Sequence, residues 1–328
     1  NLNASDTVIG GAGAADTITA TVTGLTATTG ALKISAVETV ALTTSGANTL
    51  AMAGSSGISS LIVTDNKQTI TGLDLATTVV LGLAGDESAT SSEIDVTAAD
   101  ATGTDDTLKV AVNTTNGAAT SIIDASGIES LSLTIGRSTT GTNNQANLDL
   151  TTFEGSIVTV GSAALAAGAT VTAGTVALGT LNAATVSLSS QNNGAVTASM
   201  QNATTAVTFN GLGGGIQNIT GGLRGDTFTI GSTAAVAHVI VGGDGTDTTN
   251  LTAATGLVDV STINTENVNI ALPASVDIAI TGDFNSGVND IDITGGNSLS
   301  TFNAGTLHTN ILSIDASGMA GNLLVDFA

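Results

Sequence analysis

Short stretches with alternating apolar and polar residues recur about every ten residues along the chain, which is the usual spacing of strands joined by turns. Examples are residues 37–42, 107–112, 185–188 and 267–272, where Val, Leu or Ile returns at every second position. A two-residue period places alternate side chains on opposite faces of a β-strand. The intervening Gly, Asn and Asp favour turns. The pattern therefore predicts an all-β chain of short strands.

A weak internal repeat indicates how these strands are arranged. Residues 34–42, 126–133 and 262–270 share one frame, in which Glu38, Glu129 or Glu266 precedes apolar residues set two apart. Recurring turn-and-strand phrases are typical of folds that grow by stacking repeats. We therefore predict an elongated parallel β-solenoid, similar to a β-roll, with Gly, Asp and Asn in its turns. Tandem β-sandwich domains are the alternative.

The same repetition predicts one elongated β domain over residues 1–328, with a soft boundary near 150–160. The chain starts at Asn1 rather than Met and stops within a β-like pattern. We expect it to be a fragment of a longer secreted protein.

Residues 241–251 carry the most specific motif, Val-Gly-Gly-Asp-Gly-Thr-Asp-Thr-Thr-Asn-Leu. Gly242, Gly243 and Gly245 can reach backbone angles that other residues avoid, so the turn can aim its carbonyl oxygens inward. Asp244 and Asp247 would complete an all-oxygen cage, which suits Ca²⁺. Gly-Asp clusters also mark ordinary turns, so a purely structural role remains the alternative.

Two looser copies of this motif end at Asp16 and at Asp226, each beside alternating β-type residues. The pattern is found among calcium-binding parallel β-helix repeats of RTX proteins. Over its composition and at these motifs, the chain resembles the RTX-type surface-layer proteins of Gram-negative bacteria, the Caulobacter class in particular. RTX rolls stack their nonapeptides in tandem, whereas here the copies stand apart. Any ion would therefore need ligands from neighbouring turns of different sequence.

The resemblance implies export through a type I system and an extracellular location on the cell surface. It implies calcium-driven self-assembly into a two-dimensional lattice. It also implies attachment to lipopolysaccharide through a segment outside this chain. A calcium-rigidified stalk of a secreted RTX adhesin is the alternative function.

The net charge of the chain limits the kinds of molecule that it can bind. The chain has 27 acidic residues against five Lys and Arg, a net charge of −22. Nucleic acid is excluded as a partner because phosphate binding needs clustered Lys and Arg. Such a surface repels other copies of itself unless cations neutralise it. No apolar run is long enough to span a membrane, and the absence of Cys excludes disulfides.

Two further acidic regions are candidate calcium sites or lattice contacts. Residues 86–106 hold seven acids separated mainly by Ser and Thr, and there, as in the second region, a solvated loop is the alternative interpretation. The second region includes Asp283, Asp290 and Asp292. Both offer the oxygen ligands that Ca²⁺ prefers.

Enzyme chemistry finds little support in the sequence. His238 and His308 lie far apart, Cys is absent, and neither an H-E-x-x-H nor a G-x-S-x-G motif occurs. A β-helical polysaccharide-active enzyme remains a third function, because paired carboxylates can hydrolyse a glycosidic bond. Only six Phe, with no Trp or Tyr, could form the aromatic platform of a sugar cleft. We predict that the protein is not an enzyme.

Overall fold

The structure is a computed structural model of the chain. It divides into two compact units, Asn1–Ala177 and Leu178–Ala328, and each is described by itself. The described residues contain strands and turns and no helix. These residues are 2–3, 6–23, 25, 30–45, 48–64, 66–81, 92–112, 120–135, 145–162, 175–181, 183–188, 196–211, 216–232, 237–253, 257–272, 279–284, 287–296, 299–307 and 311–327. The boundary expected near 150–160 stays a prediction.

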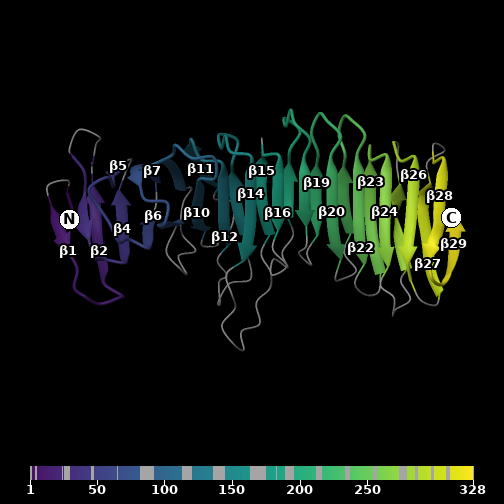
Figure 1. Ribbon diagram of the computed structural model, residues 1–328, viewed down its shortest axis with the longest axis horizontal. Helices are drawn as coiled ribbons and strands as arrows, with labels where there is room; N and C mark the ends of the chain where they lie inside the picture. The colour runs from purple at the N-terminus through teal and green to yellow at the C-terminus, as the bar shows by residue number, and fades with distance from the viewer. Residues whose placement is uncertain are drawn as a thin grey trace. The chain divides into compact units, whose positions relative to one another are not determined.

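In the first unit, the chain passes alternately between two parallel sheets, so each coil contributes one strand to each sheet (Figure 1). One sheet contains β2 (Thr17–Thr23), β4 (Thr39–Ser45), β6 (Ser60–Thr64), β8 (Thr78–Leu81), β10 (Thr107–Val112), β12 (Ser130–Ile135) and β14 (Ile157–Ser162), in that order. The other contains β5 (Asn48–Ala51), β7 (Asn66–Leu73), β9 (Ser92–Ala98), β11 (Thr120–Ser126), β13 (Gln145–Asp149) and β15 (Thr175–Thr180). A short pair, β1 (Thr7–Ile9) and β3 (Lys33–Ser35), is also parallel.

The second unit repeats this arrangement. Its even-numbered sheet contains β16 (Thr185–Leu188), β18 (Thr208–Gly211), β20 (Thr227–Ser232), β22 (Thr248–Ala253), β24 (Asn267–Leu272), β26 (Asp290–Gly295) and β28 (Ser313–Met319). Its odd-numbered sheet contains β17 (Val196–Ser199), β19 (Gln217–Thr220), β21 (Ala237–Val241), β23 (Leu257–Ile263), β25 (Ala279–Phe284), β27 (Leu299–Leu307) and β29 (Asn322–Phe327). The parallel β-solenoid predicted from the sequence is thus confirmed, in place of the β-sandwich alternative.

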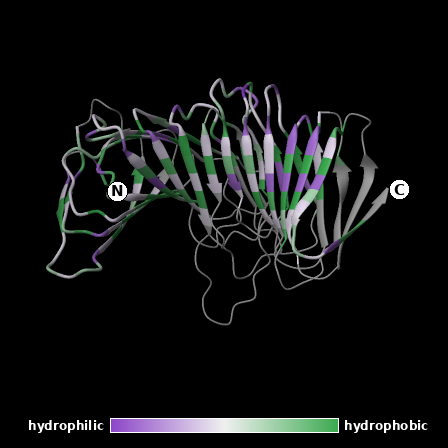
Figure 2. Cartoon of the chain, turned by 45° about the vertical axis from the view of Figure 1, so that its right-hand side comes forward, coloured by the Kyte–Doolittle hydropathy of each residue, from purple (hydrophilic) through white to green (hydrophobic). Residues whose placement is uncertain are grey.

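The core of each unit consists of columns of small apolar side chains that stack from coil to coil. Apolar and polar colours alternate along the strands in Figure 2, as a half-buried strand requires. In the first unit, one column has Val or Leu at every level, all at most 1% exposed, and consists of Val40, Leu61, Val79, Val110, Leu133 and Val160. Because each coil contacts only its neighbours, stability is built up one coil at a time.

The turn that leads into several even-numbered strands has one conformation. Ala36 and Asn264 adopt left-handed backbone angles, with φ of 51° and 50°. Each lies two residues before a glutamate of the repeated phrase, and Gly127 (φ 72°) takes the same place before Glu129. The three phrases recognised in the sequence are therefore equivalent turns of the solenoid.

This turn predicts the effect of replacing Ala36 by Gly. The left-handed conformation costs a non-glycine residue roughly 1–2 kcal/mol, part of which is offset by the greater freedom of Gly in the unfolded chain. Ala36→Gly should therefore raise the free energy of unfolding by about 0.5–1 kcal/mol, measured by urea titration and far-ultraviolet circular dichroism. Ala41→Gly in β4 is the control and should be destabilising. A loss of stability in Ala36→Gly would contradict the assignment.

Candidate functional site

A ladder of carboxylates runs along the second unit at the start of consecutive even-numbered strands. The backbone N–H of Val207 donates to Asp226 Oδ1 at 2.7 Å, and that of Asp226 donates to Asp247 Oδ1 at 2.6 Å. The N–H of Asp247 donates in turn to Glu266 Oε2 at 2.6 Å. Each acid thus accepts a hydrogen bond from the residue at the same place in the preceding coil.

The same contact occurs in the first unit, where Asp16 N–H donates to Glu38 Oε2 at 2.8 Å and Asp106 N–H donates to Glu129 Oε2 at 2.9 Å. A backbone N–H withdrawn from water needs an acceptor, and a side chain of the next coil supplies it at this corner. The sequence showed the glutamates of the repeat, but their role depends on which residue lies beside them in the adjacent coil.

The glycine-rich loops also use the second oxygen of their aspartates. Asp16 Oδ2 accepts the N–H of Gly11 at 2.7 Å, and Asp226 Oδ2 accepts the N–H of Gly222 at 2.5 Å. Asp247 differs, because its Oδ2 atom is buried and accepts no hydrogen bond from the described residues. Of these three aspartates, Asp247 is the one with a buried oxygen that has no hydrogen-bond partner among the described residues.

The first glycine of the 242–247 loop is required by close contact with the next coil. A Cβ atom on Gly242 would lie 1.8 Å from the carbonyl oxygen of Asn264 and 2.4 Å from Asp247 Oδ2. Two oxygen atoms, each an acceptor, therefore lie against this glycine. Gly243 and Gly245 have φ of 109° and 136°, angles that side chains rarely tolerate.

Burial makes the charge on Asp247 unfavourable. The residue is 0% exposed. Burial, with smaller contributions from the charges of Asp226, Glu266 and Asp244, raises the pKa of its carboxyl to about 6, although the hydrogen bond from Asp226 N–H acts in the opposite direction. The pKa of Asp226 is also raised by burial. A proton or a cation beside Asp247 Oδ2 would relieve this cost.

Three buried hydroxyl groups near this corner were not predicted. Thr249, Thr262 and Thr265 are each 0% exposed, and their Oγ1 atoms have no hydrogen-bond partner among the described residues. Thr249 stacks between Phe228 and Val268 in an otherwise apolar column. In the sequence, the only sign of these buried hydroxyl groups is a Thr at a position where the alternating pattern expects an apolar side chain.

Thr265 occupies a place that other turns fill with an apolar residue. It directly precedes Glu266, as buried Val37 and Ile128 precede Glu38 and Glu129. Because buried hydroxyl groups are normally paired, the three unpaired ones at Thr249, Thr262 and Thr265 mark these successive coils as unusual.

The structure does not bring the other predicted ligands to this place. Asp244 is exposed, and its N–H donates to Gly222 O at 3.1 Å. Asp290 and Asp292 project from the exposed face of β26, where Ser313 Oγ donates to Asp290 Oδ1 at 2.7 Å. Asp283 lies in β25, and its side chain is outside the described residues.

The acidic region 86–106 is described only from residue 92 onward, so Asp86 and Glu87 lie outside the described residues. Across the described part of the chain, no group of three or more His, Cys, Asp or Glu could hold a metal ion through these side chains alone. Any ion at Asp247 would therefore need main-chain carbonyl or hydroxyl oxygens as further ligands.

His238 is a second buried titratable group, on β21. Its Nδ1 accepts the N–H of Gln217 at 3.2 Å, which places the proton on Nε2, an atom without a partner among the described residues. Burial lowers its pKa to about 4. The His238 side chain thus accepts a backbone N–H from the preceding coil. Asn48 does the same in the first unit, where its Oδ1 accepts the N–H of Leu25 at 3.0 Å.

No family model, curated protein or solved structure matches the chain. A search of the described residues found no helix long and apolar enough to cross a membrane.

The close contact at Gly242 predicts that an alanine at this position destabilises the protein much more than an alanine at Gly11. Gly242→Ala forces Cβ against the Asn264 carbonyl and should lower the free energy of unfolding by about 1–3 kcal/mol or more. Gly11→Ala is the matched control, since its Cβ would lie 3.5 Å from the nearest atom, Asp16 Oδ2. That variant should change stability by no more than about 0.5 kcal/mol. Equal losses in the two variants would show that the Gly242 contact is not decisive.

The lowered pKa of His238 predicts acid sensitivity. Between about pH 6.5 and pH 4 the unfolded chain takes up a proton on this imidazole and the folded chain does not. The stability contributed by neutral His238 is therefore complete above pH 6.5 and is lost as pH falls toward 4. In His238→Asn, which retains an acceptor, this loss should disappear.

The measurement is the difference in unfolding free energy between wild type and His238→Asn, followed across this pH range in a calcium chelator. Asp247 titrates in the same window with the opposite sign, but it is common to both proteins and cancels. A difference that does not vary with pH would refute the prediction.

Proposed function

We propose that this chain is a structural segment of a secreted bacterial surface-layer protein, which assembles with other copies of itself in a calcium-dependent manner into a two-dimensional lattice on the cell surface. The observation that carries the calcium dependence is the buried Asp247 carboxylate with an unpartnered oxygen. The resemblance to RTX surface-layer proteins and the solenoid fold support the structural role.

The residues present fit a calcium ion. Asp247 Oδ2 and the Asn264 carbonyl oxygen both lie against Gly242, so two oxygen atoms from different coils come together at this glycine. Carboxylate and carbonyl oxygens are ligands that Ca²⁺ prefers. A bound ion would offset the cost of burying the ionised carboxyl and join two successive coils, because Asp247 and Asn264 belong to different ones.

Charge supports the dependence of assembly on cations. With a net charge of −22, two copies repel each other on close approach. Salt at physiological concentration screens exposed charges only beyond about 8 Å. Faces in direct contact would therefore need bound cations between them. The exposed carboxylates of Asp290 and Asp292, two residues apart on one face of β26, are among the candidate contacts that lie within the described residues.

The calcium site predicts a specific loss in one aspartate variant. Extracellular calcium modules bind with Kd of about 10⁻⁴–10⁻³ M, so 10 mM Ca²⁺ should stabilise the wild type by about 1.4–2.7 kcal/mol relative to chelator. Asp247→Asn keeps an acceptor for Asp226 N–H but removes the charge, and should lose this stabilisation.

Asp244→Asn is the matched control, since it removes an equal charge at an exposed position of the same loop and should respond to calcium as the wild type does. Unfolding in urea with and without Ca²⁺, followed by far-ultraviolet circular dichroism, measures the effect. An unchanged calcium response in Asp247→Asn would overturn the site.

Assembly is tested separately by electron microscopy of the purified protein in calcium and in NaCl of equal ionic strength. Ordered sheets in calcium alone support the lattice, whereas sheets in both salts show that general screening suffices. Isolated rods in calcium favour the stalk of a secreted adhesin.

A further inference from the structure

One turn of the first unit is much shorter than its neighbours. Residues 52–59 join β5 to β6 and residues 99–106 join β9 to β10, whereas β7 and β8 are joined by residues 74–77 alone. A short turn between two long ones leaves a gap at this corner of the solenoid.

The strands on both sides of the short turn are irregular. The pairing of β7 with β9 shifts between Thr71 and Leu73, and Gly72 between them has φ of 66°. The pairing of β8 with β10 begins at Thr78 and Lys109, so the first two residues of β10 extend past β8. Bulges of this kind often lie beside functional sites because they re-aim the chain.

The result is a cavity of about 470 Å³, within the range typical of small-ligand sites. Its lining combines an apolar floor with carboxylates and contains no basic residue. The lining residues are Met52, Ala53, Ser55, Gly72, Leu73, Asp74, Leu75, Ala99, Asp100 and Asp106.

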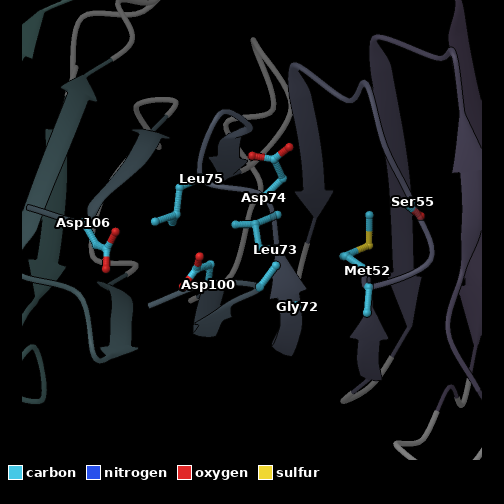
Figure 3. Close-up of a pocket in the computed structure, with 10 residues that line it drawn as sticks. Met52, Ser55, Gly72, Leu73, Asp74, Leu75, Asp100 and Asp106 are labelled. Atoms are coloured by element: carbon cyan, nitrogen blue, oxygen red, sulfur yellow. The ribbon is translucent and has the colours of Figure 1, made fainter. Parts of the chain in front are cut away.

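Figure 3 shows Leu73 and Leu75 among the carboxylates of Asp74, Asp100 and Asp106. These three acids are not grouped closely enough to hold one metal ion. They are separated around an apolar surface instead. A compact inorganic cation cannot contact them together, whereas an extended ligand with several positive charges can.

The carboxylates are held in place by their own loops. Asp74 Oδ1 accepts the N–H of Ala76 at 2.9 Å, and Asp100 Oδ1 accepts the N–H and the hydroxyl of Thr102 at 3.2 and 2.7 Å. These bonds from Thr102 lower the pKa of Asp100, so this carboxyl is ionised over a wide pH range. The Oδ2 atoms of Asp74 and Asp100 accept no hydrogen bond from the described residues, so they are available to a ligand.

We propose that this cavity binds a linear aliphatic polyamine, with its ammonium groups on the separated carboxylates of Asp74, Asp100 and Asp106 and its methylene segments on Leu73 and Leu75. Hydrogen bonds between ammonium and carboxylate are the stronger, charge-assisted kind. Alkyl stems of cationic groups pack on apolar surface while their charged heads meet polar groups. This binding is independent of the calcium site and of the proposed function.

The test is calorimetric titration of the full chain with spermidine at physiological ionic strength, in the presence of a calcium chelator. We expect one saturable site in the wild type. Asp74→Asn and Asp100→Asn each remove a contact at an exposed residue, so both variants should fold and weaken the affinity roughly three- to tenfold. Leu75→Ala should also weaken it, because it removes apolar contact without changing charge.

Asp290→Asn is the matched control, because it removes an equal charge in the other unit and should leave the affinity unchanged. Hexane-1,6-diol has an alkyl chain without positive charge, and Mg²⁺ has positive charge without an alkyl chain. Neither should compete with spermidine at equal concentration. Absence of saturable spermidine binding overturns the proposal. So does an equal loss of affinity in Asp290→Asn, or displacement by Mg²⁺, since either outcome shows only general attraction of cations to an acidic protein.

Discussion

The corner between an odd-numbered and an even-numbered strand is the constraint on which these solenoid coils depend. At several of these corners the ladder of main-chain bonds is interrupted, and an N–H there must find another acceptor. In the second unit Asp226, Asp247 and Glu266 supply it for successive coils. Side chains of the following coil therefore complete the backbone bonding of the one before it. This requirement explains why acids appear at a fixed place ahead of a strand although the overall charge opposes them.

The sequence predicted the fold well because the fold depends on local and periodic information. A two-residue apolar period is visible within single strands, and the glutamates at 38, 129 and 266 recur in one frame because they occupy equivalent turns. The sequence also located Asp247 and its glycines, since close approach of the next coil tolerates no side chain there.

The sequence could not separate Asp247 from Asp16 and Asp226. All three end similar glycine-rich loops, but the loop itself satisfies the second oxygen only in Asp16 and Asp226. That difference lies in the geometry of the loop rather than in residue type. Thr249 and Thr265 were missed for a related reason. Thr is common on the exposed faces of these strands, and its inward placement follows from register with the neighbouring coil.

The carboxylate contacts have a direction along the chain. In each of these pairs the acceptor belongs to the coil that comes later in sequence, about 20 residues after the N–H that it receives. At these corners, a chain that leaves a ribosome or an export channel one end at a time therefore cannot complete the bonding of one coil until the next one has emerged. If the N-terminus emerges first, a growing end at one of these corners carries a vacant N–H until the next coil supplies its carboxylate. If the C-terminus emerges first, the growing end carries a bare carboxylate instead, which remains soluble and repels its neighbours until its donor arrives.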